Sequence, residues 1–412
     1  MTGNQKKRKK SLKAPWLVYY GLGQAMMKSK IKNHQFIVHN EATKHIQPPF
    51  IALGNHQGRW DWAYGTMALM PHMVRVVVTK YQLFRPEGKL ITLAKAIPKS
   101  QFAPDPGAVL EILRTIRGGG AVLMYPAGRL SEFGDDFKPF PGTYELIKKL
   151  NVPVIMLQLD GGYRTGPRYN HGLNIKGPVV LTTSVLFTPE ELQSLSEEEA
   201  VKRLDGAFCH DDFDSPNQGE YECENLIEGL EELLYICPAC KSDFTMKTTA
   251  DQTIKCGECG FAATMDARFR LKGENGAVCP ATITAWGNLI RAEERRRADE
   301  NPDYFIRTEM KLCEHVHKKE MFTPIGTVEG VCNKNGFFLK GDRNGEPFER
   351  HYSCEEYPAI TYMEKVDILL PDNERVVCAR LGTAGKAIQF AVVSEMFSIK
   401  EKEAKAQRQA PV

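Results

Sequence analysis

Short apolar runs alternate with amphipathic segments from about residue 49 to residue 190. Buried strands are predicted over residues 50–53, 74–79, 121–125, 153–159 and 179–187. Helices are predicted over residues 61–70, 87–95, 107–117 and 142–150, the third of them preceded by the capping pair Asp105-Pro106. Because strands that alternate with helices are typical of α/β layer folds, we expect a mixed sheet with flanking helices here.

The rest of the chain differs in pattern from this α/β region. Residues 188–232 are strongly acidic, which predicts a solvated helical connector with an exposed loop near residues 211–219. A charged helix is predicted over residues 286–299, and the sequence becomes β-rich from about residue 309, with turn signals such as Asn335-Gly336. We therefore expect six parts: a basic N-terminal segment (1–48), an α/β domain (49–190), an acidic helical connector (191–232), a cysteine-bearing ribbon (233–265), a helix with a β-rich module (266–399) and a disordered tail (400–412).

Composition excludes several classes of protein. With 42% hydrophobic and 25% charged residues, the chain is not collagen-like, disordered or a coiled coil. Its longest apolar runs are far shorter than the ~20 residues of a spanning helix, which excludes a polytopic membrane protein. A net charge of +3 provides no general field for nucleic acid. The eleven cysteines are mostly scattered and follow no secretory leader, so we expect a reducing cytosol.

The N-terminus combines positive charge with aromatic residues. Six basic residues and no acid occur in the first 13 positions: Lys6, Lys7, Arg8, Lys9, Lys10 and Lys13. The aromatic and apolar stretch Trp16–Met27 follows directly. Such a segment can dock on an anionic membrane surface, because cations bind lipid head groups and aromatic rings favour the interface. The alternative is a disordered tail leading into a helix that packs on its own domain, and the sequence favours neither. A cytoplasmic protein peripherally associated with the membrane is expected.

His56 and Asp61 follow the first predicted strand and form a candidate catalytic pair. Positions five apart on one regular helix point ~140° away from each other, so the two side chains could not meet there. They can meet if His56 lies in the turn and Asp61 in the first turn of the helix. Asp61 would then fix the imidazole tautomer and leave the other nitrogen basic, as a general base requires. The alternative is a structural pair.

A second turn after a strand carries Gly128, Arg129 and Ser131. Ligands of open α/β sheets bind at the carboxyl ends of strands, so this turn and the His56 turn would share one crevice. A glycine turn with an arginine and a hydroxyl suits a phosphate, and Lys99 adds a further cation. Each cation taken alone is more typical of a surface charge, but together with His56 they describe a base beside an anion pocket.

These motifs resemble the ordered sequence blocks of the glycerophospholipid acyltransferases, the 1-acyl-glycerol-3-phosphate acyltransferase family. The matching segments are Asn55-His56-x4-Asp61 for the first block, Ile97-Pro98-Lys99 for the second, Tyr125–Ser131 for the third and Val152–Ile155 for the fourth. Four blocks in the right order across about residues 50–160 make the resemblance specific. Three departures are Ala127 where the family has Glu, Arg129 one place before the usual Arg, and Met156 where a second proline is common.

The resemblance implies an acyltransferase of phospholipid synthesis. The acyl group would move from acyl-CoA or acyl carrier protein to the free hydroxyl of a lysophospholipid, with 1-acyl-glycerol-3-phosphate as the leading acceptor. His56 would be the base, Asp61 its orienting partner, and Lys99, Gly128, Arg129 and Ser131 would bind substrate. A thioester is already activated, so a neutral imidazole suffices, typically for ~10²–10⁴-fold, and no covalent enzyme nucleophile is needed.

Two C-x-x-C pairs predict a metal site. Their cysteines are Cys237, Cys240, Cys256 and Cys259. Four thiolates at this spacing can hold a structural Zn²⁺, and an all-cysteine set argues against a catalytic zinc with an open position. Gly257 and Gly260 allow the backbone to fold back toward the sulfur atoms. The alternatives are a redox dithiol or free thiols.

Two further hypotheses concern binding. Residues 310–398 resemble, in pattern only, a pleckstrin-homology or GRAM module, which would bind lipid or protein or be purely structural. The rival to an enzyme is a non-catalytic protein that binds lipid or nucleic acid through the ribbon and the basic N-terminus. The ribbon mixes lysines with Asp243, Asp251 and Glu258, so no nucleic acid is expected. A third hypothesis is an acyltransferase fold that binds lipid without turnover, because Ala127 stands where the family has Glu.

Overall fold

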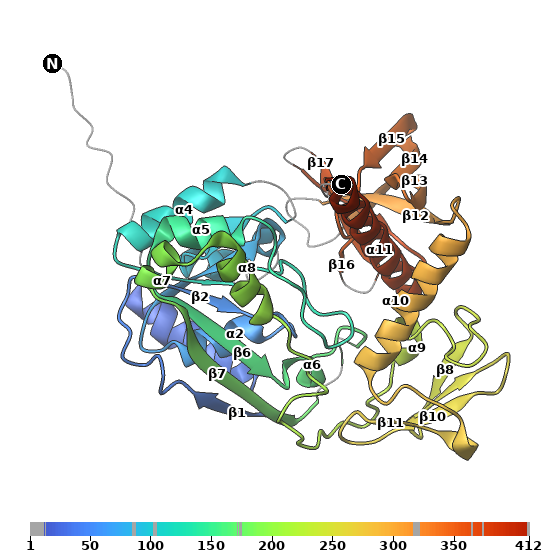
Figure 1. Cartoon of the computed structure of the whole chain (residues 1–412), viewed down its shortest axis with the longest axis horizontal. Helices are drawn as coiled ribbons and strands as arrows, with labels where there is room; N and C mark the ends of the chain where they lie inside the picture. The colour runs from blue at the N-terminus through green and yellow to red at the C-terminus, as the bar shows by residue number, and fades with distance from the viewer. Residues whose placement is uncertain are drawn as a thin grey trace.

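The computed structural model describes residues 12, 14–84, 88–101, 105–170, 172, 175–315, 322–363, 366–372 and 375–409. An α/β domain, a small four-stranded sheet and a second seven-stranded sheet with two long helices follow one another along the chain (Figure 1). The predicted α/β mixed sheet with flanking helices and the β-rich C-terminal region are confirmed.

The first sheet has seven strands in the order β1-β7-β6-β2-β5-β3-β4. Their bounds are β1 His34–His39, β2 Phe50–Gly54, β3 Val74–Thr79, β4 Ile97–Lys99, β5 Ala121–Met124, β6 Val154–Asp160 and β7 Gly177–Phe187. Strands β2 to β6 are parallel to one another, whereas β7 runs antiparallel to β6 and β1 runs parallel to β7. The carboxyl ends of five strands therefore lie at one edge of the sheet, where a site is expected.

Helices cover both faces of this sheet. They are η1 Leu17–Gly23, α1 Gln24–Lys30, α2 Asp61–Ala68, η2 Lys80–Phe84, α3 Gly88–Leu93, α4 Pro106–Arg117, α5 Thr143–Leu150, α6 Gly162–Thr165, α7 Pro189–Ser194 and α8 Glu197–Gly206. Ile51 and Leu53 pack with α4, α5, α7 and α8, whereas Phe50 and Ala52 pack with α1 and α2. Because side chains alternate between faces, a strand buried on both sides needs a continuous apolar run, which is the pattern that predicted β2.

Strand β1 was not predicted, and it lies within the segment 1–48 that we expected to be only membrane-proximal. It pairs with β7 from His34 opposite Gly177 to His39 opposite Thr182. The expected domain start at residue 49 therefore falls inside the sheet domain. An edge strand that buries one face and begins and ends with histidine has a weak apolar pattern.

The segment Trp16–Met27 has one buried face and one exposed face. The Tyr19 hydroxyl accepts a hydrogen bond from the Val74 amide at 3.0 Å, and Met27 is buried in the core. In contrast, Trp16, Leu17 and Leu22 are 68%, 68% and 61% exposed. The basic cluster Lys6–Lys13 lies outside the described residues. Within the residues that are described, no helix combines the length and apolar character needed to cross a membrane.

The acidic connector packs back onto the α/β domain after α8. Asp212 is fully buried and accepts hydrogen bonds from Gly161 N at 2.5 Å and from Arg164 N at 3.0 Å. The loop predicted to be exposed at residues 211–219 is exposed only in part, because Asp212, Phe213 and Ser215 are buried whereas Asp214, Pro216 and Gln218 are exposed. The physical reason is that Arg164 is itself buried and needs carboxylate partners, which Asp160 and Asp212 provide.

A four-stranded antiparallel sheet in the order β11-β10-β9-β8 carries the paired cysteines. Its elements are α9 Leu230–Leu233, β8 Met246–Thr249, β9 Thr253–Cys256, β10 Ala262–Met265, β11 Leu271–Gly273 and η3 Glu274–Gly276.

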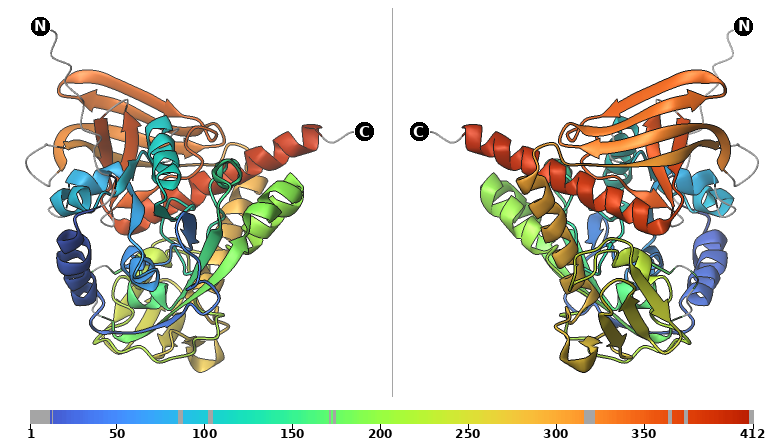
Figure 2. Two further views of the ribbon diagram at one scale, coloured as in Figure 1. Left: turned by 90° about the vertical axis from the view of Figure 1, so that its left-hand side faces the viewer. Right: turned by 90° about the vertical axis from the view of Figure 1, so that its right-hand side faces the viewer.

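The C-terminal region is an antiparallel sheet in the order β15-β14-β13-β12-β18-β17-β16. Its elements are α10 Ile283–Glu300, β12 Phe305–His315, β13 Phe322–Asn333, β14 Gly336–Arg343, β15 Glu346–Tyr352, β16 Tyr362–Met363, β17 Asp367–Asp372, β18 Arg375–Arg380 and α11 Ala384–Gln409. The turn predicted at Asn335-Gly336 joins β13 to β14. Helix α11 runs along the sheet and packs against α10 (Figure 2).

The disordered tail predicted from residue 400 is wrong for residues 400–409, because α11 continues through Gln409. Arg295 of α10 donates to Glu403 at 2.6 Å, and Lys405 pairs with Glu355 at 3.0 Å. The lysine, glutamate and alanine residues of this stretch favour a helix, and a neighbouring helix supplies the partners for their charges.

Candidate active site

The turn after β2 brings His56 and Asp61 together. His56 lies in the turn and Asp61 is the first residue of α2, and His56 Nδ1 lies 2.8 Å from Asp61 Oδ2. Gly58 N also donates to Oδ1 at 3.0 Å and to Oδ2 at 2.9 Å. Asp61 is buried, and this burial raises the pKa of its carboxyl, against the hydrogen bonds from His56 and Gly58. The arrangement is the one the five-residue spacing required.

Tyr125 holds both members of this pair. Its ring stacks on the His56 imidazole, with centroids 4.6 Å apart and planes 26° apart. Its hydroxyl donates to the Asp61 carbonyl oxygen at 2.6 Å. Gly54 and Gly65 leave room for it, since a Cβ at either would lie 2.7 Å from a Tyr125 atom. The His56 side chain remains 24% exposed, and its Nε2 has no hydrogen-bond partner among the described residues.

Asn55 and Gln57, on either side of His56, both donate hydrogen bonds to the Asp136 carboxylate, which the sequence analysis did not identify. Asp136 accepts hydrogen bonds from both amide groups and from His210 N. Asn55 also bonds the backbone of Leu159 in both directions, at 2.9 and 2.7 Å. Burial raises the pKa of Asp136 to about 7. In sequence, Asp136 resembles any acid of a surface turn, so no local signal identifies it.

The loop after β4 lies next to the turn after β5, as a shared anion pocket requires. Gln101 Nε2 donates to the Gly128 carbonyl oxygen at 2.7 Å. Lys99 Nζ donates to the Ser100 carbonyl at 2.9 Å, and Lys80 Nζ to the Ser100 hydroxyl at 2.9 Å. Burial lowers the pKa of Lys99. The two cations therefore lie around one short loop at the carboxyl edge of the sheet.

Ser131 and Arg129 are more enclosed than their predicted roles suggest. Ser131 is buried; its hydroxyl donates to the Asp135 carbonyl at 2.7 Å and accepts from Gly134 N at 2.8 Å, so it closes a turn. Arg129 is 8% exposed, lies over the Phe137 ring and pairs with Glu395 of α11. Sequence reasoning missed Glu395 altogether.

The four paired cysteines form a candidate metal centre. Their sulfur atoms all lie within 4.8 Å of one another, with Cys237 and Cys259 3.7 Å apart and Cys240 and Cys256 3.8 Å apart. Tetrahedral zinc with bonds of about 2.3 Å places its sulfur ligands about 3.8 Å apart, so the set fits Zn²⁺. As predicted, the backbone turns back after the second pair, where Gly260 has φ of 76°; Lys241 has φ of 63° after the first.

Hydrogen bonds around the sulfur atoms also favour metal binding. The Thr245 hydroxyl lies 3.2 Å from Cys256 Sγ, and the Ser242 hydroxyl lies 2.8 Å from Cys240 Sγ. Against the effect of burial, hydrogen bonds from Thr245 and two backbone amides lower the pKa of the Cys256 thiol, whereas burial raises the pKa of its neighbour Cys237. A thiolate is the form that binds metal.

A second group of possible ligands, Asp160, His210 and Asp212, does not fit a metal. Arg164 donates to Asp160 at 3.0 Å and to Asp212 at 3.3 Å, so a buried guanidinium already neutralises these carboxylates. Ser215 further donates to Asp160 at 2.6 Å. The group is a buried ion-pair network beside the active-site strands.

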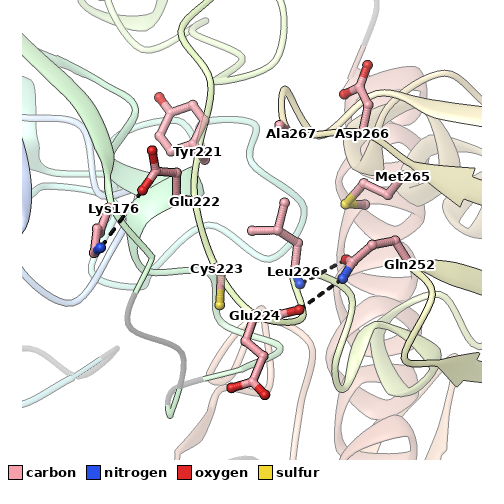
Figure 3. A pocket seen from close by; sticks show the side chains of 10 residues that line it. All are labelled: Lys176, Tyr221, Glu222, Cys223, Glu224, Leu226, Gln252, Met265, Asp266 and Ala267. Atoms are coloured by element: carbon pink, nitrogen blue, oxygen red, sulfur yellow. Dashed lines mark hydrogen bonds and ion pairs between the residues drawn. The ribbon is translucent and has the colours of Figure 1, made fainter.

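A pocket of about 500 Å³ lies between the connector and the ribbon and contains none of these residues (Figure 3). Acidic Glu222, Glu224 and Asp266 line it together with Lys176 and Cys223. Lys176 pairs with Glu222 at 3.8 Å across its wall. Nothing in this lining connects it to the His56 chemistry.

Comparison with known proteins found a match to part of the chain. Residues 35–158 match the family model described as Acyltransferase. No curated protein matches the chain at a significant level. Among solved structures, the chain is similar to the 1-acyl-sn-glycerophosphate (LPA) acyltransferase PlsC from Thermotoga maritima, with 17% sequence identity and a TM-score of 0.39. That alignment covers 46% of this chain and 78% of the other.

Proposed function

We propose, on the premise that residues 35–158 match the family model described as Acyltransferase, that the protein moves a fatty acyl group from a thioester donor to the free hydroxyl of a lysophospholipid. The observation that carries the proposal is the His56–Asp61 pair, 2.8 Å apart at the carboxyl edge of the sheet within that domain. The proposed donors are acyl-CoA and acyl carrier protein, and the leading acceptor is 1-acyl-glycerol-3-phosphate.

In the proposed mechanism, Asp61 accepts a hydrogen bond from the Nδ1–H group of His56 and so leaves Nε2 with a free lone pair. Nε2 takes the proton of the acceptor hydroxyl as the oxygen attacks the thioester carbonyl carbon. The tetrahedral intermediate collapses by breaking the carbon–sulfur bond, and the imidazolium returns the proton to the leaving thiolate. General base catalysis of this kind contributes ~10²–10⁴-fold. Tyr125 keeps the imidazole in the orientation that Asp61 needs.

The acceptor's phosphate is proposed to bind at Lys99, Gly128 and Arg129. The hydrogen bond between Gln101 and Gly128 supports this grouping, because it holds the Lys99 loop against the Gly128 turn. The enclosed hydroxyl of Ser131 is left out of this set, since it completes hydrogen bonds within its own turn.

The decisive experiment tests His56→Ala with purified protein, acyl-CoA or acyl carrier protein donors, and a panel of lysophospholipids. Diacyl product should form with the wild type and fall at least about 100-fold in the variant. The control is His45→Ala, because His45 is exposed and lies in the same domain. Turnover by folded His56→Ala close to that of the wild type would contradict the mechanism.

We further propose that the N-terminus binds the protein peripherally to anionic membranes. The exposed residues Trp16, Leu17 and Leu22 support this, as do the six basic residues that precede them in sequence. Each cation near an anionic leaflet contributes about 1 kcal/mol. Replacing Trp16 and Leu17 by serine should reduce sedimentation with anionic vesicles, and added salt should do the same. Leu110→Ser, at an exposed position of α4, is the matched control.

The cysteine cluster is proposed to hold one structural Zn²⁺. Such an ion would cross-link the two C-x-x-C turns and stabilise the ribbon, as structural zinc does in small modules. The fit of the sulfur separations to a tetrahedral site supports it.

A further inference from the structure

The predicted anion-binding arginine already has an anionic partner from the far end of the chain. Arg129 Nη2 donates to Glu395 Oε1 of α11, and the guanidinium lies 3.4 Å from the centroid of the Phe137 ring. Arg129 is 8% exposed, whereas the Glu395 side chain is 26% exposed. The carboxylate is therefore more accessible to solvent than the arginine that it binds.

Helix α11 is held in place by contacts along much of its length. Gly385 N donates to the Glu232 carboxylate at 2.5 Å near its start. The Ser394 hydroxyl, one residue before Glu395, accepts from Ile360 N at 2.9 Å. Glu403 pairs with Arg295 at 2.6 Å further along. Glu395 is thus presented to Arg129 by a fixed helix, and the contact between them is a property of the fold.

The other terminal nitrogen of Arg129 is the second observation. Arg129 Nη1 is buried and has no hydrogen-bond partner among the described residues. A buried donor without an acceptor costs free energy, which a ligand oxygen placed there would recover. Arginine binds carboxylate and phosphate through paired N–H groups, so Glu395 fills one half of this fork and the other half lacks an acceptor in the described part of the chain.

We propose, on the premise of the function proposed above, that Glu395 is a specificity-determining residue that occupies half of the phosphate site at Arg129. A phosphomonoester carries about −1.5 to −2 charges at neutral pH and would meet the Glu395 carboxylate at close range. A phosphodiester carries a single charge and can use Nη1 alone. Glu395 therefore weakens the binding of acceptors with a terminal phosphate, including the leading acceptor 1-acyl-glycerol-3-phosphate, more than it weakens the binding of lysophospholipids whose phosphate is a diester. Like charges placed together are a common way to reject a ligand.

The test compares Glu395→Gln with the wild type in two assays. The KM for a phosphomonoester acceptor should fall about tenfold with kcat unchanged, while the KM for a phosphodiester acceptor changes less than about threefold. Calorimetric titration with sn-glycerol 3-phosphate, with no acyl donor present, should show about tenfold tighter binding. Glu403→Gln, which removes a carboxylate from the same helix, should change neither value.

The two assays separate this inference from the proposed function. Tighter binding of sn-glycerol 3-phosphate by Glu395→Gln supports the inference even if no acceptor is acylated, in which case the proposed function fails alone. The inference would be overturned if an active, folded variant bound sn-glycerol 3-phosphate no more tightly and kept the same ratio of KM values for the two acceptor classes. The Arg129–Glu395 pair would then have a structural role only. Should Glu395→Gln not fold, Glu395→Asp retains the charge on a shorter side chain; an intermediate gain in affinity supports the inference, and none overturns it.

Discussion

Replacing Asp61 by asparagine tests the catalytic pair with almost no change in volume. The carboxylate oxygens receive hydrogen bonds from His56 Nδ1 at 2.8 Å and from Gly58 N at 3.0 and 2.9 Å. Asparagine retains one oxygen. If that oxygen faces Gly58, the amide group donates to Nδ1 and the imidazole proton moves to Nε2, which abolishes the base. If it takes the place of Oδ2, it still accepts from His56 and Gly58, but the amide nitrogen then takes the place of Oδ1, 3.0 Å from the Gly58 N–H, so that two donors face each other.

We therefore expect Asp61→Asn to lose most of the general-base contribution, about 10²–10⁴-fold in kcat, or about 2.7–5.5 kcal/mol of transition-state stabilisation. Initial rates of acyl transfer measure kcat, and a circular dichroism melt checks the fold. Asp205→Asn, which removes a carboxylate of α8 that pairs with Lys138, is the matched control. A loss of less than about tenfold in a folded Asp61→Asn protein would refute the assigned role.

Three further predictions concern the surroundings of the site and the ribbon. Tyr125→Phe keeps the ring stack but loses the hydroxyl bonded to Asp61 O at 2.6 Å, so stability should fall by about 1 kcal/mol and kcat severalfold; denaturant unfolding and rate assays measure both. Cys256→Ser should reduce zinc content from about one per chain toward zero by metal analysis and lower the melting temperature, whereas Cys209→Ser should do neither. Burial raises the pKa of Asp136 to about 7. Its stabilising contribution is thus complete below its unfolded pKa of about 4 and is lost as pH rises to 7, so Asp136→Asn should flatten the fall in melting temperature between about pH 4 and about pH 7.

The sequence predicts much of the α/β domain because strands buried on both faces need continuous apolar runs. The meeting of His56 with Asp61 and the grouping of the four cysteines could also be predicted, since each depends on spacing within a short segment. Contacts between distant segments could not. Glu395 lies 266 positions from Arg129, and Asp212 lies 48 positions from Arg164. A run of acidic residues predicts a solvated segment. The buried arginine that pairs with one of these residues lies elsewhere in the chain and cannot be identified from the run itself.

Strand β1 and the end of α11 show a second reason why the sequence does not predict every element. The edge strand buries alternate residues only partly, so its pattern is weak, and the tail from residue 400 has the composition of a solvated segment. Both become ordered through partners that are distant in sequence: β7 for the strand, and α10 for the helix. Periodicity describes which face a segment buries but does not name the surface against which it is buried.

The buried core around Phe133 makes the chain difficult to divide. Phe133, in the turn after β5, belongs to the same apolar cluster as Cys237 of the ribbon and Trp286 of α10. A Cβ at Gly287 would collide with the Phe133 ring, so α10 lies directly against this turn. A fragment ending at residue 232 would lose the contacts between that ring and α10. The ribbon and the C-terminal sheet are therefore internal supports of the acyltransferase domain, and the protein should melt as a single cooperative unit in calorimetry, with no separate transition for each part.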